Sequence, residues 1–513
     1  MKKKTYIKPL LCTLLLSTLF LSSCELNLFE SINSSNDTET SDTSSNSDET
    51  SDNNSSENNG NNETTYVPSS YPFTLKEANN SMGYYSLNPI GEQNILVIPV
   101  KLSGATSWSE TMLARLEKAF FGTSEDTNYF ESVKSFYERA SYNKFSLKGE
   151  IAPVFNSSYT VSQIKNGNED AIENNVIEEF YQNADPELLK RHDLDNDGRV
   201  DATIFIYSNN YDGNNFWAWV WYLNENNTSM SKPTIGTYMW ASYNFMNDGL
   251  TASEQLTKVD AHTYIHEFGH VLGLDDYYCY DDDGWDPVGT SEMQSYNVGD
   301  QSIYSKFQLG WANPQIIRPN TSSIDVTLKT SALYNDGILI NDTWNNTPMD
   351  EYILIEYYTP QGNNYTDSLK KYDGVQMYTT SGLRIYHADA RLVKLTTSAT
   401  SSTYSDTIKN DAIYFPGASN STSWSYLKSP YNSTYRLVQL MQADVTSASS
   451  MNHFKNGGSN TNSTLYGLNQ TFKASSVFFA NGTKFNDGTE VGYSVTMIEQ
   501  NGDECTVRIQ KLS

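Results

Sequence analysis

The sequence predicts an α+β protein in which a mixed sheet with helices is followed by an all-β region. Up to about residue 320, apolar runs typical of strands alternate with segments whose apolar residues recur every three or four positions, as on one face of a helix. Beyond residue 320 the apolar runs are short and separated by Gly, Asn, Ser and Thr, which is the pattern of a β-sandwich. We therefore expect a folded domain at 66–320 and a sandwich-like domain at 321–513.

Apolar periodicity also places the individual elements. Residues 95–100 predict a buried strand, and Pro99 is expected near an edge or an end because proline cannot donate to a ladder. Helical spacing occurs in 113–120 and 133–140, and a third helix is expected around 172–181. The other strands are expected at 144–147, 203–207, 216–221, 352–358, 383–387, 437–441 and 494–498, with a hairpin turn at Asn501 and Gly502.

The 513 residues carry a formal net charge of −27. This charge argues against nucleic acid as a partner, because binding it requires basic side chains that neutralise phosphates. Acidity of this size is typical of a soluble chain and is compatible with calcium binding.

The N-terminus predicts export and anchoring. Basic residues 2–4 precede an apolar stretch at 10–21 that is too short to span a bilayer, as in a secretion signal. The stretch ends in Leu-Ser-Ser-Cys, which resembles a bacterial lipoprotein processing box, so we expect a signal peptide at 1–24 and a lipid on Cys24. Ordinary signal cleavage is the alternative. The mature protein is expected on the extracellular face of a bacterial cell membrane, held by that lipid, or secreted.

Residues 25–65 predict a disordered tether. From 31 to 65 the chain is almost wholly Ser, Asn, Thr, Asp and Glu, without a lysine, an arginine or an aromatic residue, so it cannot bury a core. Once the signal has left and Cys24 carries lipid, only Cys279 and Cys505 remain, which is no disulfide framework. Whether these two pair is left open.

The most informative stretch is 266–276, His-Glu-Phe-Gly-His-Val-Leu-Gly-Leu-Asp-Asp. On a helix, His266 and His270 lie four apart on one face and can bind a single Zn²⁺, with Glu267 beside it. Gly273 then ends the helix where a positive φ is often needed, and the turn delivers Asp276 as a third ligand. The sequence therefore predicts one catalytic zinc site, with a fourth position open for water.

His262 competes for the place of third ligand but fails on distance. It lies roughly 12 Å along the axis from His270, too far for both to reach one zinc ion. We assign it a supporting or purely structural role. Glu267 can instead act as general base while water attacks a carbonyl, which is metal-assisted hydrolysis of an amide.

A second acidic motif lies at 193–201, with Asp193, Asp195, Asp197 and Asp201 at positions 1, 3, 5 and 9 of a loop whose sixth residue is glycine. Oxygen ligands at this spacing can wrap Ca²⁺. Position 12 is isoleucine, so the bidentate glutamate of a complete EF-hand is missing. A solvated turn is the alternative, and the aspartates at 281–283 are as compatible with a solvated loop as with a metal site.

With these motifs in view, the chain resembles the immune inhibitor A family of secreted bacterial zinc metallopeptidases. The resemblance rests on 266–278 (HEFGHVLGLDDYY), on 287–300 and 306–311, and more weakly on 141–145, 217–221 and 382–387. It implies a zincin, metzincin-like, catalytic domain with zinc on His266, His270 and Asp276 and with Glu267 as base. It also implies a structural methionine turn at Met293 and calcium at 193–201.

The favoured expectation is thus an extracellular, lipid-anchored zinc endopeptidase that acts on a protein or peptide substrate. A non-catalytic surface adhesin or binding lipoprotein on a zincin-like fold is the rival. Glu267 separates the two, because a binding protein does not need a base beside its metal. Zinc-dependent hydrolysis of a non-protein substrate shares every site residue.

Overall fold

The computed structural model of the protein describes residues 74–81, 83–167, 169–211, 215–223, 228–280, 286–317, 322–395, 413–421, 435–445 and 460–512. The expected signal peptide, Cys24, the tether at 25–65 and the aspartates at 281–283 lie outside the described residues. Within the described residues, no helix is both long and apolar enough to cross a bilayer.

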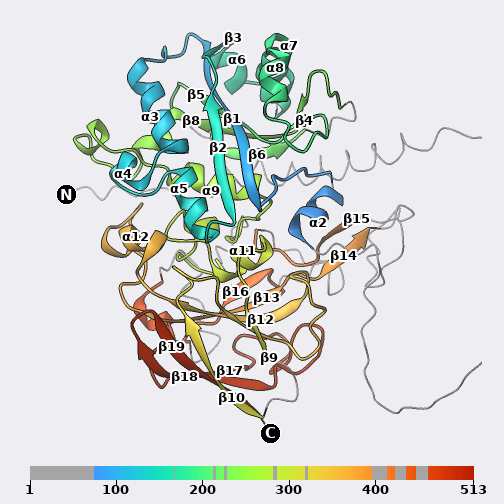
Figure 1. Cartoon of the computed structure of the whole chain (residues 1–513), viewed down its shortest axis with the longest axis vertical. Helices are drawn as coiled ribbons and strands as arrows, with labels where there is room; N and C mark the ends of the chain where they lie inside the picture. The colour runs from blue at the N-terminus through green and yellow to red at the C-terminus, as the bar shows by residue number, and fades with distance from the viewer. Residues whose placement is uncertain are drawn as a thin grey trace, which may run out of the picture.

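The protein is a mixed α+β structure with several sheets. Figure 1 shows helices around the first sheet in the upper half of the view and mainly strands in the lower half, with α9 (His262–Val271) and α11 (Ile303–Gln308) between them. The first sheet has the order β2-β1-β5-β8-β6, and β3 also pairs with β1. Its strands are β1 (Gly91–Ser103), β2 (Phe145–Ile151), β3 (Phe155–Thr160), β5 (Thr203–Tyr207), β6 (Trp219–Tyr222) and β8 (Thr237–Ser242).

Every pairing in this sheet is parallel except that of β6, which runs antiparallel to β8 at the edge. Pro99 lies inside β1, and not at the edge or end that its missing N–H led us to expect. The backbone of Val97 faces β2, since its carbonyl accepts from Ala152. By alternation the Pro99 nitrogen faces the same side, where β2 has ended at Ile151 and β3 begins only at Phe155, so no ladder bond is lost.

Two helices of this half begin at serine caps. Ser109 caps α3 (Glu110–Phe121) and Ser132 caps α5 (Val133–Ala140), each accepting a backbone N–H with its hydroxyl. The expected third helix is a π-helical segment, Ile172–Ile177, that continues into α7 (Glu178–Asn183). The shorter helices are α2 (Leu75–Ser81), α4 (Ser124–Thr127), α6 (Val161–Lys165) and α8 (Pro186–Lys190).

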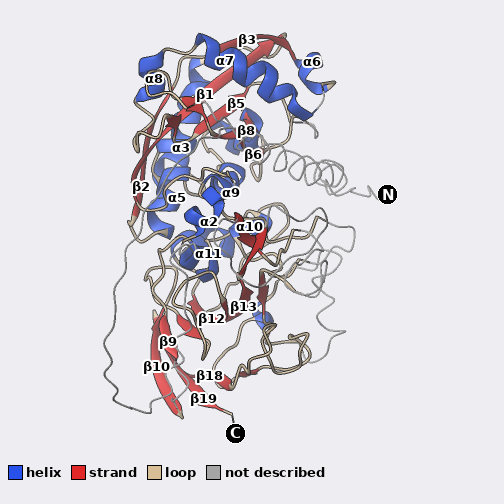
Figure 2. Ribbon diagram, turned by 90° about the vertical axis from the view of Figure 1, so that its right-hand side faces the viewer, coloured by secondary structure: helices blue, strands red, loops and turns tan. Residues whose placement is uncertain are grey.

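Helix α9 (His262–Val271) carries the motif that predicts zinc binding and packs on one face of the first sheet (Figure 2). Its apolar residues Ile265 and Phe268 join a core with Met239 and Ala241 of β8. The N-cap residue of α9 makes no side-chain hydrogen bond to the helix. The Asp260 carboxylate accepts the His262 N–H instead, at 2.9 Å. The buried helix therefore has a fixed starting point.

The lower half contains two further sheets, with orders β16-β13-β12-β11-β9 and β10-β19-β18-β17. Their apolar faces share one core, which includes Ile353 and Leu383 from the first of these sheets and Val495 and Val507 from the second. The strands are β9 (Gln315–Ile317), β10 (Ser323–Lys329), β11 (Ile338–Ile340), β12 (Glu351–Tyr358), β13 (Gly382–Asp389), β16 (Val438–Leu440), β17 (Thr471–Lys473), β18 (Tyr493–Asn501) and β19 (Glu504–Lys511).

The region after residue 320 is not purely β. It includes a short helix, α12 (Tyr365–Leu369), which follows a 3-10 turn at Gly362–Asn364. The polar sequence there has no apolar periodicity that would have indicated a helix. The expected hairpin turn is present, since Asn501 and Glu504 are partners across β18 and β19 and Gly502 has a φ of 60°.

Candidate metal centre

The imidazoles of His266 and His270 face each other across one turn of α9, with their Nε2 atoms 3.2 Å apart. The Asp276 carboxylate completes a triangle, because its Oδ1 lies 3.0 Å from Nε2 of His266 and 3.3 Å from Nε2 of His270. Ligands about 2.0–2.1 Å from a tetrahedral zinc ion are roughly 3.3 Å from each other. The three atoms therefore have the spacing that a shared metal ion requires.

Both histidines have their second ring nitrogen tied to the backbone. Nδ1 of His266 donates to the Met293 carbonyl at 2.8 Å, and Nδ1 of His270 donates to the Leu274 carbonyl at 2.7 Å. These bonds fix the ring orientations and place a proton on each Nδ1, so that each Nε2 is directed to the centre of the triangle.

The turn after α9 delivers Asp276. Gly273 has a φ of +96°, and a Cβ there would lie 2.2 Å from the Nδ2 of Asn79. That amide donates to the Gly273 carbonyl at 3.1 Å, so α2 closes over the turn. Tyr280 then donates its hydroxyl to Oδ2 of Asp276, which leaves Oδ1 to face the histidines.

Glu267 is buried next to the two histidines. Within the described part of the chain its carboxylate accepts no hydrogen bond from the protein, whereas the Asp276 carboxylate is fully engaged. Burial raises the pKa of Glu267, and the neighbouring His266 and His270 offset part of the rise. A buried carboxylate that makes no structural bond is suited to exchange a proton with a reacting group.

The charges of the triangle support each other. Burial disfavours charge on all three groups, but the His270 and His266 rings hold the pKa of Asp276 below its usual range. In turn Asp276 raises the pKa of His270 to about 10 against the effect of burial. Two imidazole nitrogens and a carboxylate oxygen thus converge on one point, and together they stabilise a positive charge there. This arrangement fits a zinc ion.

Met293 begins the short helix α10 (Met293–Tyr296) and is fully buried in the core that contains α9. Its carbonyl, and not only its apolar side chain, serves the site by holding Nδ1 of His266. The next residue, Gln294, donates to the His266 carbonyl at 3.1 Å and accepts from Gln301 at 2.8 Å. No sequence pattern indicated a role for Gln294, and Tyr280 was indicated only as one of the tyrosines that follow the motif.

His262 is separate from the triangle, as the distance argument required. Its Nδ1 lies 2.7 Å from Oδ1 of Asp260, and its Nε2 lies 3.3 Å from each carboxylate oxygen of Asp367. The ring is therefore occupied on both sides and does not reach the candidate metal position.

In the acidic loop, carboxylate oxygens of Asp193, Asp195 and Asp197 lie within 4.8 Å of one another. Asp201 is directed differently, because its Oδ2 accepts the Leu194 N–H at 3.1 Å. The Asp193 carboxylate also accepts the N–H groups of Asp197 and Gly198. The loop thus brings three of the four expected aspartates together, and their carboxylates hold the loop backbone.

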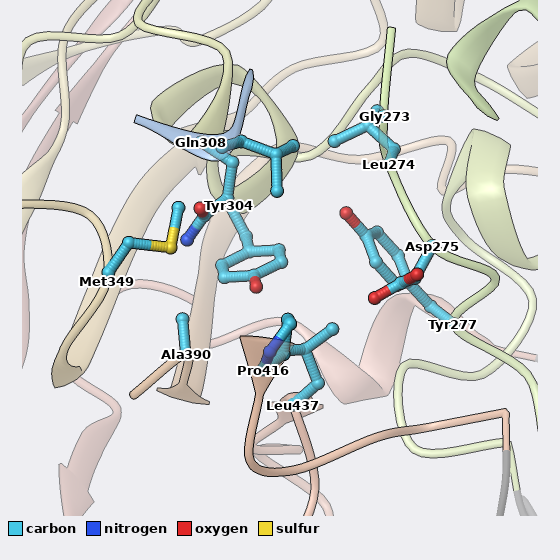
Figure 3. Close-up of a pocket in the computed structure, with 11 residues that line it drawn as sticks. Gly273, Leu274, Asp275, Tyr277, Tyr304, Gln308, Met349, Ala390, Pro416 and Leu437 are labelled. Atoms are coloured by element: carbon cyan, nitrogen blue, oxygen red, sulfur yellow. The ribbon is translucent and has the colours of Figure 1, made fainter. Parts of the chain in front are cut away.

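A small pocket lies beside the turn that follows α9 (Figure 3). Gly273, Leu274 and Asp275 line one side of it, with the rings of Tyr277 and Tyr304 close by, but none of His266, His270 and Asp276 does. This pocket is therefore distinct from the metal triangle. Elsewhere, Cys279 and Cys505 are both buried and are not joined by a disulfide.

Comparison with known proteins adds no assignment: no family model and no curated protein matches the chain.

Proposed function

We propose that the protein is a zinc-dependent endopeptidase that hydrolyses peptide bonds outside the cell, as its resemblance to the immune inhibitor A family implies. On this proposal residues 66–320 form a zincin-like catalytic domain and residues 321–513 a sandwich-like domain. Cys24 carries the lipid that anchors the chain. The observation that carries the proposal is the triangle of His266, His270 and Asp276 with Glu267 unbonded beside it.

The four residues have different roles in the proposed reaction. His266, His270 and Asp276 would hold zinc, which polarises the scissile carbonyl and makes a water molecule acidic enough to lose a proton near neutral pH. Glu267 takes that proton while the water oxygen attacks the carbonyl carbon. The same carboxyl then passes the proton to the leaving amine as the C–N bond breaks.

The test separates the two carboxylates. Glu267→Gln keeps the shape and all three ligands, so zinc content should stay near one per chain while turnover falls by roughly 10²- to 10⁴-fold. Asp276→Ala leaves only two histidines, so zinc and activity should be lost together. Asp276→His should recover metal, because imidazole is an equally suitable ligand. The soluble chain lacking residues 1–65 and a diverse peptide library serve as enzyme and substrate.

Three outcomes count against the proposal. A zinc-replete Asp276→Ala protein refutes the ligand assignment, and an active Glu267→Gln protein refutes the mechanism. A wild-type protein that contains zinc but cleaves no peptide leaves the rival functions, a non-catalytic adhesin or a different hydrolase. The cleavage assay is run with and without a chelator. Replacement of exposed Asp325 by asparagine is the matched control, since it removes a carboxylate from a surface pair with Arg508.

We also propose that the loop at 193–201 binds a structural Ca²⁺. The proximity of the Asp193, Asp195 and Asp197 carboxylates supports this, and Asp201 at the ninth position would act through water. Millimolar calcium should raise the thermal midpoint of the wild type, because it binds the native state alone. The Asp195→Ala variant should lose that increase. A wild type whose thermal midpoint does not change with calcium would show that the loop is only a solvated turn.

The membrane anchor is tested separately. Cys24→Ala should release the protein or leave it unprocessed. A mature N-terminal peptide without acyl mass would rule out the lipid.

A further inference from the structure

His262 lies one helical turn before the first proposed zinc ligand and is completely buried. Asp260, just before α9, bonds its Nδ1 at 2.7 Å and also accepts its backbone N–H at 2.9 Å. On the opposite side, Nε2 lies 3.3 Å from both oxygens of Asp367, a residue of α12 that is 105 positions further along the chain. The start of the metal-binding helix is thus tied to the C-terminal half of the protein.

Aromatic rings cover both faces of the same imidazole. Phe130 stacks at a centroid distance of 3.9 Å and Tyr372 at 4.1 Å, with interplanar angles of 16° and 24°. Burial alone would lower the pKa of His262, but Asp260 and Asp367 raise it to about 10. The ring is therefore a cation at neutral pH, which both carboxylates and both aromatic faces stabilise.

The Asp367 carboxylate makes a second contact that also leads to the metal centre. Its Oδ2 accepts the Gly299 N–H at 2.7 Å. Gly299 has a φ of +66°, and a Cβ there would lie 2.6 Å from Cε of Met377 and 3.0 Å from Oδ1 of Asn364. The backbone that follows Met293 is therefore pressed directly against α12 and the residues that flank it.

These contacts converge on one ring. His266 depends on α9 for its position and on the Met293 carbonyl for its orientation. We propose that Asp367 is a positioning residue for the metal centre, acting through His262 on the start of α9 and through Gly299 on the segment that carries Met293. The inference rests on the proposed zinc function and gives the C-terminal half a role in it.

The expected effect is on the metal and not only on folding. Asp367→Asn keeps all three ligands and Glu267 but removes the charge that faces His262 and weakens the acceptor for Gly299. The ring of His266 then loses part of its support, and loss of such outer contacts lowers metal affinity by about 10- to 100-fold. A residue that only stabilises the fold would leave the affinity of the folded protein unchanged.

The experiment measures Zn²⁺ affinity by chelator competition and the visible absorption of the Co²⁺-substituted protein. Wild type, Asp367→Asn and the matched control Asp325→Asn are compared, after thermal unfolding has shown each to be folded at the assay temperature. We expect Asp367→Asn to bind zinc about 10- to 100-fold more weakly and to shift the cobalt bands. Asp325→Asn should match the wild type, and Asp367→Glu should recover part of the affinity.

The outcomes separate this inference from the proposed function. A wild type that binds neither ion refutes the zinc function itself. A wild type that binds zinc beside a folded Asp367→Asn variant with the same affinity and spectrum refutes the positioning role alone. If Asp367→Asn does not fold, Asp367→Glu decides, because it keeps the charge but displaces the carboxylate from His262 and from the Gly299 N–H by one methylene. An affinity and a cobalt spectrum identical to those of the wild type in that variant also refute the role.

Discussion

Gly269, between the two proposed ligand histidines, has no room for a methyl group. A Cβ there would lie 2.1 Å from Oε1, 2.5 Å from Cδ and 2.6 Å from Nε2 of Gln294. Gln294 is fully buried and cannot move aside without breaking its bonds to the His266 carbonyl and to Gln301. Gly269→Ala should therefore displace the glutamine and disturb the backbone of His266, a proposed metal ligand.

The expected loss of stability follows from the two hydrogen bonds that Gln294 would lose. Each hydrogen bond lost with a buried partner left unsatisfied costs about 1–3 kcal/mol, or roughly 2–6 kcal/mol for the pair. The higher helix propensity of alanine returns about 1 kcal/mol. A net loss of about 3 kcal/mol corresponds to a fall of roughly 4 °C in thermal midpoint if roughly 400 residues unfold together at about 2.1 cal/mol/K each.

A double-mutant cycle in thermal unfolding is the assay. Gln294→Ala shortens the side chain that clashes, so the double variant Gly269→Ala/Gln294→Ala should be no less stable than Gln294→Ala alone. The two losses are thus expected to be strongly non-additive. Additive losses, or a Gly269→Ala protein as stable as the wild type, would refute the close approach.

Three further changes test single contacts. Tyr280→Phe removes the hydroxyl that fixes Oδ2 of Asp276, so zinc affinity measured by competition should fall by about 10- to 100-fold in a folded protein, and unchanged affinity contradicts the contact. Met293→Leu conserves volume in the core and leaves the backbone carbonyl in place, so it should lower the free energy of unfolding by less than about 1.5 kcal/mol and keep zinc. Complete loss of the metal in this variant would assign the sulfur a different role. Burial raises the pKa of Asp248 to about 7, so the folded state holds a proton that the unfolded state releases near pH 4, and this group makes stability fall as pH rises from about 4 to 7. Asp248→Asn keeps an acceptor for Tyr211 and should flatten that fall in thermal midpoints taken across this range, whereas an unaltered slope would remove Asp248 as its source.

Local patterns predicted the parts of the fold that depend on local physics. The apolar run at 95–100 lies within β1, and the spacings at 113–120 and 133–140 lie within α3 and α5. The motif spacing was also sufficient to predict that His266, His270 and Asp276 would meet, because a helix and one glycine turn fix their geometry. That zinc occupies the triangle remains a prediction.

Contacts between distant segments could not be predicted in this way. Asp367 meets His262 across 105 positions, and no periodicity connects a polar stretch such as 362–369 to a helix in the other half. Pro99 shows the same limit, since its place depends on where β2 ends and β3 begins. Sequence patterns report which face of an element is apolar, but not which element covers it.

The position of Asn460 has a consequence for the order of synthesis. Its backbone donates to Thr290 and its side chain to Ser291, so the segment that carries Met293 is completed by a residue 184 positions beyond Asp276 (460 − 276). At about 5–20 residues per second, a ribosome needs roughly 10 to 40 s to cover that interval. During this time the motif helix exists without its full surroundings, so the nascent chain carries the proposed metal ligands before the contacts around them are complete. The surroundings of the triangle are therefore complete only after residue 460 has been made.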